Sequence, residues 1–279
     1  MKVALHSVPK GFFKSNPPYA SRNLFRLIRE AAFWGFKCFQ VGPLNNFVDI
    51  DGKSLKRILA RYGMKSSVHV GGLYDATKFA TTEEEYGRAQ KEIHYGVELS
   101  KEINSTLVSF HPPFFETSNL KKRTLLSKVR SRFYKLVEEE LEFAYNNRIK
   151  MALESFCYPP FIFNGLRDFM QFVSCFPQTR LGVLLEVGHL YQAKFSLDEA
   201  IQIFENRLLD IHVHDATQQE DFRMATHLPI GRGNIDFSRL ITMLREAKYN
   251  GWLTLEIHGD KKEIVESKNF LENLISIVA

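Results

Sequence analysis

Three glutamates each follow a run of apolar residues in this chain. Glu154 follows Met-Ala-Leu, Glu186 follows Val-Leu-Leu, and Glu256 follows Leu-Thr-Leu. A carboxylate at the end of a buried strand is costly unless it is paired or coordinates a cation. Three such carboxylates gathered at one place would repel one another, and a divalent cation would remove that repulsion. The three glutamates therefore predict a metal site.

Histidines stand in comparable positions in or after other apolar runs, at His6, His69, His111, His212 and His214. A single histidine at a strand end more often anchors a loop through a hydrogen bond than binds a metal, so the prediction depends on the joint pattern. Carboxylate and imidazole ligands together suit manganese, zinc, cobalt or iron better than calcium. A structural zinc site is disfavoured, because no cysteine stands at these positions.

The segment Ile211–Asp215 contains two of these histidines. His212 and His214 are two residues apart, so their side chains point to the same side of a strand. The sequence leaves open which of them is the metal ligand. Asp215 could orient one of the imidazoles by accepting a hydrogen bond from it.

The apolar runs that carry these residues predict eight strands. They cover Val3–His6, Cys38–Val41, Ser67–Val70, Leu107–His111, Lys150–Glu154, Gly182–Glu186, Asp210–His214 and Leu253–Ile257. Amphipathic segments separate or follow them and predict eight helices. They cover Ser21–Trp34, Gly52–Arg61, Glu83–Glu102, Leu120–Asn147, Gly165–Cys175, Leu197–Asn206, Phe237–Lys248 and Lys261–Ile277. Ser21, Ser196 and Asp236 are expected to cap three of the helices, and Gly35 is expected to follow the first.

Regular alternation of strands and helices implies parallel strands joined by right-handed crossovers. Eight such units favour a closed (β/α)₈ barrel, a fold that commonly reaches about 250 residues in one domain. No linker-like stretch divides the chain, so residues 1–279 are expected to form a single barrel domain. In such a barrel the active site lies where strands end and the following loops begin, which would bring the glutamates and histidines together.

The bulk composition is that of a globular protein, with 44% hydrophobic residues and 37 basic against 32 acidic residues. The resulting charge of +5 does not require a nucleic-acid partner, although residues 121–132 (KKRTLLSKVRSR) are strongly basic. The cysteines, Cys38, Cys157 and Cys175, form no CxxC pair, which argues against disulfides. The absence of a signal-like start and of an apolar run near the roughly 20 residues that span a bilayer predicts a soluble, cytoplasmic protein without a membrane partner.

Four segments give the chain a resemblance to the xylose isomerase-like barrel superfamily. They are LGVLLEVGH (Leu181–His189), IHVHD (Ile211–Asp215), HLPIGRGNIDF (His227–Phe237) and YNGWLTLEIHG (Tyr249–Gly259). The superfamily includes sugar isomerases and epimerases as well as apurinic endonucleases of the endonuclease IV type. The resemblance covers essentially the whole chain, and the last two segments look most like the isomerase and epimerase members.

In the isomerase branch, the resemblance implies one divalent metal ion (manganese, zinc or cobalt) held by Glu154, Glu186, His212 and Glu256. Glu154 and Glu256 would be the catalytic pair that exchanges protons of a sugar or sugar phosphate. His189 would contact a substrate hydroxyl, and Arg232 would lie near the same mouth. The expected chemistry is proton transfer next to a carbonyl, through an enediolate that the metal stabilises. The expected partner is then a small carbohydrate substrate. The sequence leaves open whether the protein forms a homo-oligomer.

In the endonuclease branch, the resemblance implies up to three metal ions and a nucleic-acid partner. His69, His111 and Glu154 match the ligands of one ion, and Glu154, Glu186, His212 and Glu256 match those of a second. His189 and His227 match two ligands of the third. The aspartate expected two residues before His227 is Ala225, and the family usually has aspartate where this chain has Glu186. The isomerase is the preferred prediction, and an apurinic endonuclease that hydrolyses phosphodiesters is the alternative.

Overall fold

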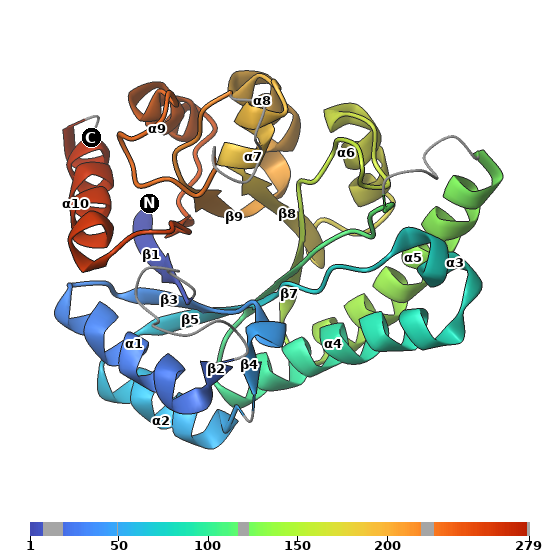
Figure 1. Cartoon of the computed structure of the whole chain (residues 1–279), viewed down its shortest axis with the longest axis horizontal. Helices are drawn as coiled ribbons and strands as arrows, with labels where there is room; N and C mark the ends of the chain where they lie inside the picture. Colours follow the sequence, from blue (N-terminus) through green and yellow to red (C-terminus); the bar gives the residue numbers. More distant parts are fainter. Residues whose placement is uncertain (8–18, 49, 117–122, 219–225, 278–279) are drawn as a thin grey trace.

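Eight parallel strands close into a barrel in the computed structural model, which describes residues 1–7, 19–48, 50–116, 123–218 and 226–277 (Figure 1). The barrel strands are β1 (Lys2–His6), β3 (Cys38–Val41), β5 (Lys65–Val70), β6 (Leu107–Phe110), β7 (Lys150–Glu154), β8 (Leu181–Glu186), β9 (Leu208–Val213) and β10 (Trp252–Leu255). They pair in the order β1-β10-β9-β8-β7-β6-β5-β3, and β3 closes onto β1. The predicted (β/α)₈ barrel is therefore confirmed.

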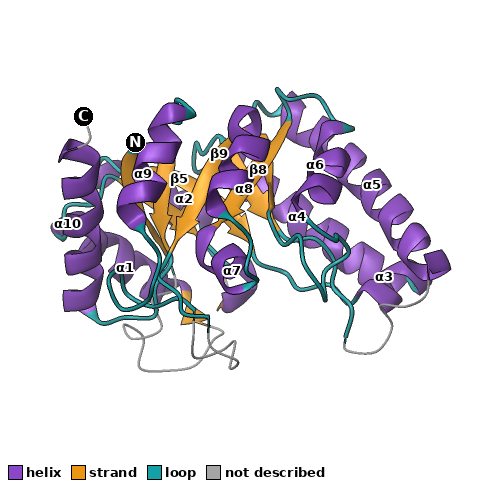
Figure 2. Ribbon diagram, turned by 90° about the horizontal axis from the view of Figure 1, so that it is seen from above, coloured by secondary structure: helices purple, strands orange, loops and turns teal. Residues whose placement is uncertain are grey.

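Helices surround the strands as an outer layer (Figure 2). They are α1 (Ser21–Phe33), α2 (Gly52–Arg61), α3 (Ala76–Thr81), α4 (Glu83–Glu102), α5 (Arg123–Asn146), α6 (Leu166–Ser174), α7 (Val187–Gln192), α8 (Leu197–Phe204), α9 (Phe237–Glu246) and α10 (Lys261–Ile277). Among the described residues, no helix is both long and apolar enough to cross a membrane. The three cysteines are free thiols, as predicted.

The eight predicted helices are present, and the structure adds short elements that the sequence patterns did not reveal. The six-residue helices α3 and α7 follow β5 and β8, and the two-residue strands β2 (Tyr19–Ala20) and β4 (Phe47–Val48) pair with each other. Elements of this length cover at most two turns of a helix or one repeat of a strand. They are therefore too short to show a hydrophobic periodicity.

Helix starts are fixed by side chains that accept hydrogen bonds from free backbone N–H groups. Ser196 accepts one from the Glu199 amide and Asp236 one from the Arg239 amide, so these two predicted caps are confirmed. Ser21, predicted as a cap, is instead the first residue of α1. Asp51 caps α2 in the same way.

The strands are buried on both faces, as the helical outer layer of a parallel barrel requires. All six residues of β8 are buried, for example. Polar side chains nevertheless occur inside the barrel. Those on the barrel strands that are at most 1% exposed and were not predicted to have a function are Gln40, Ser67, Ser109, Asp210 and Thr254.

Helix α4 packs tightly against the barrel at Gly96. A Cβ atom there would lie 2.4 Å from Cγ2 of Val70 on β5 and 3.5 Å from Cγ1 of Val108 on β6. Gly87, in the same helix, would place a Cβ atom with no other atom within 4 Å. The two positions therefore differ in the space around them and share the same helical backbone.

We predict opposite effects for alanine at these two positions. Gly87→Ala should raise the free energy of unfolding by about 0.4–1 kcal/mol, because it restricts the unfolded chain and fits the helix. Gly96→Ala should lower that free energy, since overpacking against stiff β-branched neighbours costs about 1–3 kcal/mol. Urea unfolding of both variants beside the parent measures the difference. A Gly96→Ala protein as stable as Gly87→Ala would contradict the close packing of α4.

Candidate metal centre

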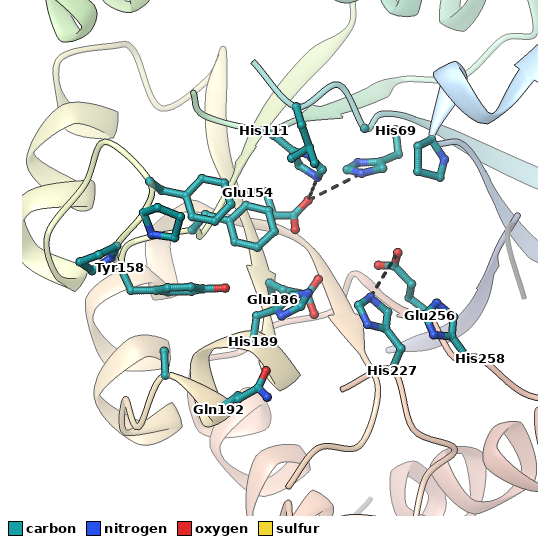
Figure 3. A pocket seen from close by; sticks show the side chains of 18 residues that line it. His69, His111, Glu154, Tyr158, Glu186, His189, Gln192, His227, Glu256 and His258 are labelled. Atoms are coloured by element: carbon teal, nitrogen blue, oxygen red, sulfur yellow. Dashed lines mark ion pairs between the residues drawn. The ribbon is translucent and has the colours of Figure 1, made fainter. Parts of the chain in front are cut away.

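A cavity of about 870 Å³ opens at the carboxyl ends of the strands (Figure 3). It is lined by Pro43, His69, Gly71, Leu73, His111, Glu154, Phe156, Tyr158, Pro159, Pro160, Phe161, Glu186, His189, Gln192, Ala193, His227, Glu256 and His258. Seven of the nine predicted site residues are among them. The strand ends therefore converge as the barrel topology predicted.

His212 lies at the centre of the carboxylates, fully buried beneath the cavity surface. Its Nδ1 atom is 3.0 Å from Oε2 of Glu186 and 2.7 Å from Oε2 of Glu256. These residues end or follow β8 and β10, the two neighbours of β9, so the barrel register places them around one imidazole nitrogen. This geometry makes His212, and not His214, the histidine that faces two carboxylates.

His214 lies behind Glu186. Its Nε2 atom is 2.6 Å from Oε1 of Glu186, and its Nδ1 atom accepts a hydrogen bond from the His227 amide at 2.8 Å. A nitrogen that accepts leaves the other ring nitrogen to carry the hydrogen, so the ring turns a protonated Nε2 toward Glu186. Gly188 makes room for this ring, because a Cβ atom there would lie 1.9 Å from its Cε1. His214 thus restrains a carboxylate.

Glu154, at the end of β7, faces two further histidines across the cavity. Its Oε2 atom is 2.9 Å from Nε2 of His111 and 3.7 Å from Nε2 of His69. Ser109 fixes the His69 ring through a contact of 2.9 Å between its hydroxyl and Nδ1. One candidate ligand atom each from His69, His111 and Glu154 lie within 4.8 Å of one another, which is close enough for a single cation.

Two further groups meet the same distance criterion. One joins Glu154 to Glu186 and His212, so Glu154 belongs to two groups. The other consists of His189, His214 and His227, with candidate ligand atoms also within 4.8 Å of one another. The position of the expected aspartate, Ala225, lies outside the described residues.

The charges of the site are balanced by imidazoles. Burial alone would raise the pKa of Glu186, but His214 and His212 hold that pKa well below its ordinary value. Burial likewise opposes ionisation of Glu256, whose pKa His6 and His212 hold well below the usual range. Burial raises the pKa of Glu154. None of the described residues that line the cavity is a lysine or arginine, so the carboxylates lack a fixed cation there.

Two expectations about the loop after β9 need correction. Arg232 is exposed and is not among the described residues that line the cavity. Asp215 orients no imidazole through its carboxylate. That carboxylate accepts hydrogen bonds from the backbone amides of Ala216, Gly231 and Ile235. It therefore folds the Gly-rich segment that contains Arg232 back onto the strand end.

Several cavity residues escaped the sequence patterns because they lie in loops. Phe156 and Tyr158 follow β7, and Phe156 stacks parallel to Phe161 with ring centroids 4.2 Å apart. Figure 3 shows the Tyr158 hydroxyl pointing into the cavity toward Glu186. His258, two residues after Glu256, stacks on His227 at 4.6 Å. The sequence signal that could have identified His258 is its spacing, because residues two apart in an extended segment point to the same side and Glu256 was already a predicted ligand.

Curated relatives share limited identity with the chain. An uncharacterized protein of Methanocaldococcus jannaschii is 26% identical over 195 residues, which are 67% of this chain and 62% of that protein. The chain thus spans less than two thirds of that relative. An inosose dehydratase of Clostridium botulinum is 20% identical over 283 residues and covers 93% of this chain and 91% of its own length.

Solved structures share the fold over the whole chain. A D-tagatose 3-epimerase-like protein superposes with a TM-score of 0.82 at 22% identity, covering 100% of this chain and 98% of its own. An IolI protein with a bound zinc atom gives 0.78 at 14% identity, with coverages of 100% and 99%. The model of one family matches residues 28–274. The chain therefore belongs to the xylose isomerase-like TIM barrel family.

Proposed function

We propose that this protein is a divalent-metal-dependent isomerase or epimerase of a carbohydrate, which transfers a proton next to a carbonyl group. The observation that carries the proposal is the convergence of three carboxylates around His212, of which Glu154 and Glu186 are buried and Glu256 is partly buried. The zinc of the IolI structure and the epimerase likeness in fold support it.

The donor set fits a divalent ion. Glu154 and Glu186 are 3% and 1% exposed, and such buried carboxylates are stable only when paired or bound to a cation. The proposed ligands are Glu154, Glu186, His212 and Glu256, a mixture of oxygen and nitrogen that suits manganese, zinc or cobalt. When bound, the ion would offset the carboxylate charge and polarise a carbonyl oxygen of the substrate.

The cavity wall fits a carbohydrate. Phe156 contacts the rings of His111 and His189, with centroids 5.1 and 5.4 Å apart, so an apolar face lies beside the candidate metal ligands. Ligand cavities of this kind combine apolar walls with a few polar groups that fix orientation. The ring C–H groups of a sugar can pack on the aromatic face, and Gln192 and Tyr158 offer hydrogen-bonding groups for hydroxyls.

Glu154 and Glu256 are the proposed proton-transfer pair. They belong to β7 and to the end of β10, which are separated in the barrel by β8 and β9. They therefore reach the cavity from different sides, as Figure 3 shows. A carboxylate on one side of a bound sugar can remove a proton, and a carboxylate on the other side can return one.

A metal-dependent phosphodiesterase is the second candidate function. The observation in its favour is that three groups of candidate ligands, not one, surround the cavity. Clusters of metal ions activate water and stabilise the leaving oxygen of a phosphodiester. The basic segment at residues 121–132 gives this alternative less support than its sequence suggests. Arg130 pairs with Asp168 and Arg132 with Glu83, so each already has a carboxylate partner within the chain.

Removing one carboxylate should remove the metal. We expect Glu186→Ala to lose most bound metal, measured by emission spectroscopy after dialysis, because a charged ligand of the site is absent. The metal-dependent rise in thermal midpoint should disappear with it, a stabilisation of about 2.7 kcal/mol at a hundredfold excess over Kd. Glu140→Ala is the matched control, since it removes a buried carboxylate that pairs with His94 on α4. Parental metal content in Glu186→Ala would exclude Glu186 as a ligand.

Proton transfer can be tested separately from metal binding. Glu154→Gln and Glu256→Gln should each reduce exchange of a substrate C–H proton with deuterated solvent, in a panel of ketoses, by about 10²–10⁴-fold. Glutamine keeps the shape of the side chain and accepts no proton. The metal content of each variant must be shown to match the parent. A variant that keeps both its metal and its exchange rate has no role in proton transfer.

Metal stoichiometry separates the two candidate functions. The isomerase predicts about one tightly bound ion per chain and no cleavage of DNA. Titration with zinc to three ions per chain, together with salt-sensitive cleavage of DNA that contains abasic sites, would favour the phosphodiesterase. His69→Gln should then abolish the cleavage, whereas for a single-ion isomerase it should leave the first equivalent of metal bound.

A further inference from the structure

A chain of buried hydrogen bonds lies beneath the candidate metal centre. Asp210 on β9, Gln40 on β3 and His212 on β9 are all 0% exposed. Nε2 of Gln40 is 2.9 Å from Oδ2 of Asp210, and Oε1 of Gln40 is 2.7 Å from Nε2 of His212. The amide therefore bridges a carboxylate and an imidazole in the barrel interior.

The direction of this chain follows from its donors and acceptors. Oδ1 of Asp210 accepts hydrogen bonds from the Thr254 hydroxyl at 2.8 Å and from the Ile211 amide at 2.9 Å. A carboxylate with such neighbours accepts at Oδ2 as well, so the NH₂ group of Gln40 must face it. The carbonyl of Gln40 then faces His212, and a carbonyl can only accept. Nε2 of His212 must therefore carry a hydrogen.

We propose that Asp210, acting through Gln40, is the positioning residue that presents Nδ1 of His212 to the divalent ion. The inference rests on the proposed function only in taking His212 as a metal ligand. Nδ1 lies 2.7 and 3.0 Å from the carboxylates of Glu256 and Glu186, whereas Nε2 faces away from them. A hydrogen fixed on Nε2 leaves Nδ1 as the coordinating atom and holds the plane of the ring.

The opposite orientation of the amide would disable the ligand. If the NH₂ group of Gln40 faced Nε2, that nitrogen would have to accept, and the hydrogen of a neutral ring would stand on Nδ1. Nδ1 could then not bind a cation. Asp210 prevents this orientation, because its oxygen would then face the Gln40 carbonyl without a donor between them. Two buried acceptor oxygens that face each other leave at least one group without a hydrogen bond, which costs about 1–3 kcal/mol.

Metal affinity is the first test. Gln40→Met keeps the volume of the side chain and removes both hydrogen bonds, and it should weaken zinc binding by about 10–100-fold. Asp210→Asn should weaken it in the same direction. Its oxygen keeps the hydrogen bonds from the Thr254 hydroxyl and the Ile211 amide, so its NH₂ group faces Gln40 and turns the Gln40 carbonyl away from His212. The double variant Gln40→Glu/Asp210→Asn should restore affinity to within a few-fold of the parent. There, Glu accepts from His212 and from the Asn amide.

Thr254→Val is the matched control for a merely structural role. It breaks a hydrogen bond of the same buried carboxylate at 0% exposure and leaves the Gln40 contact in place. It should lower the thermal midpoint and leave the zinc affinity unchanged. Parental affinity in Gln40→Met, or an equal loss in Thr254→Val and Asp210→Asn, would overturn the proposal.

Nitrogen NMR of the parent protein gives a test that does not depend on variants of Gln40 or Asp210. In zinc-loaded protein with ¹⁵N-labelled histidine, His212 should show zinc at Nδ1 and hydrogen at Nε2. The resonance is identified by its absence from His212→Gln. Hydrogen on Nδ1, or zinc on Nε2, would overturn the role of Gln40 while leaving the metal site intact. Failure of the parent to bind zinc would instead contradict the proposed function.

Discussion

The constraint on which the site depends is the repulsion between carboxylates that barrel closure forces together. Each strand end is fixed by its register with two neighbours, so Glu154, Glu186 and Glu256 cannot move apart without breaking the barrel. At exposures of 1–17% they are poorly screened by water. Imidazoles occupy the spaces between them, and His212 stands between two of the three. A divalent cation is the natural partner of such an arrangement.

The fold and the strand-end residues could be predicted because both follow from periodic patterns. Apolar runs such as LGVLLE indicate a strand that is buried on both faces. The last residue of such a strand then lies at the carboxyl end of the barrel, where the cavity opens. Glu154 and Glu186 were found in this way. The same logic cannot place a loop, because loop conformation depends on a few local contacts. Asp215, whose carboxylate accepts hydrogen bonds from three backbone amides of the following loop, is the example that the sequence interpretation missed.

Residues within the barrel were missed for a different reason. Gln40 and Asp210 are 170 residues apart in the chain. Nothing in the sequence indicates that these two polar residues, on different strands, form a hydrogen bond. Only the register of β1 with β3 and with β10 brings β3 near β9 inside the closed barrel. The distinction between His212 and His214 has the same origin. Both point inward, and their different roles appear only when the neighbours of each ring nitrogen are known.

Glu186, His214 and Gly188 illustrate how the arrangement of one site residue can depend on its neighbours. Glu186 has one more rotatable bond than an aspartate would have, so its carboxylate would lose more freedom on binding a cation. His214 restrains the carboxylate beforehand, because its Nε2 atom lies 2.6 Å from Oε1, which leaves Oε2 toward His212. The imidazole fits only because residue 188 is glycine. The longer carboxylate, the second histidine and the glycine thus form one unit, in which each residue has its role only if the others are present.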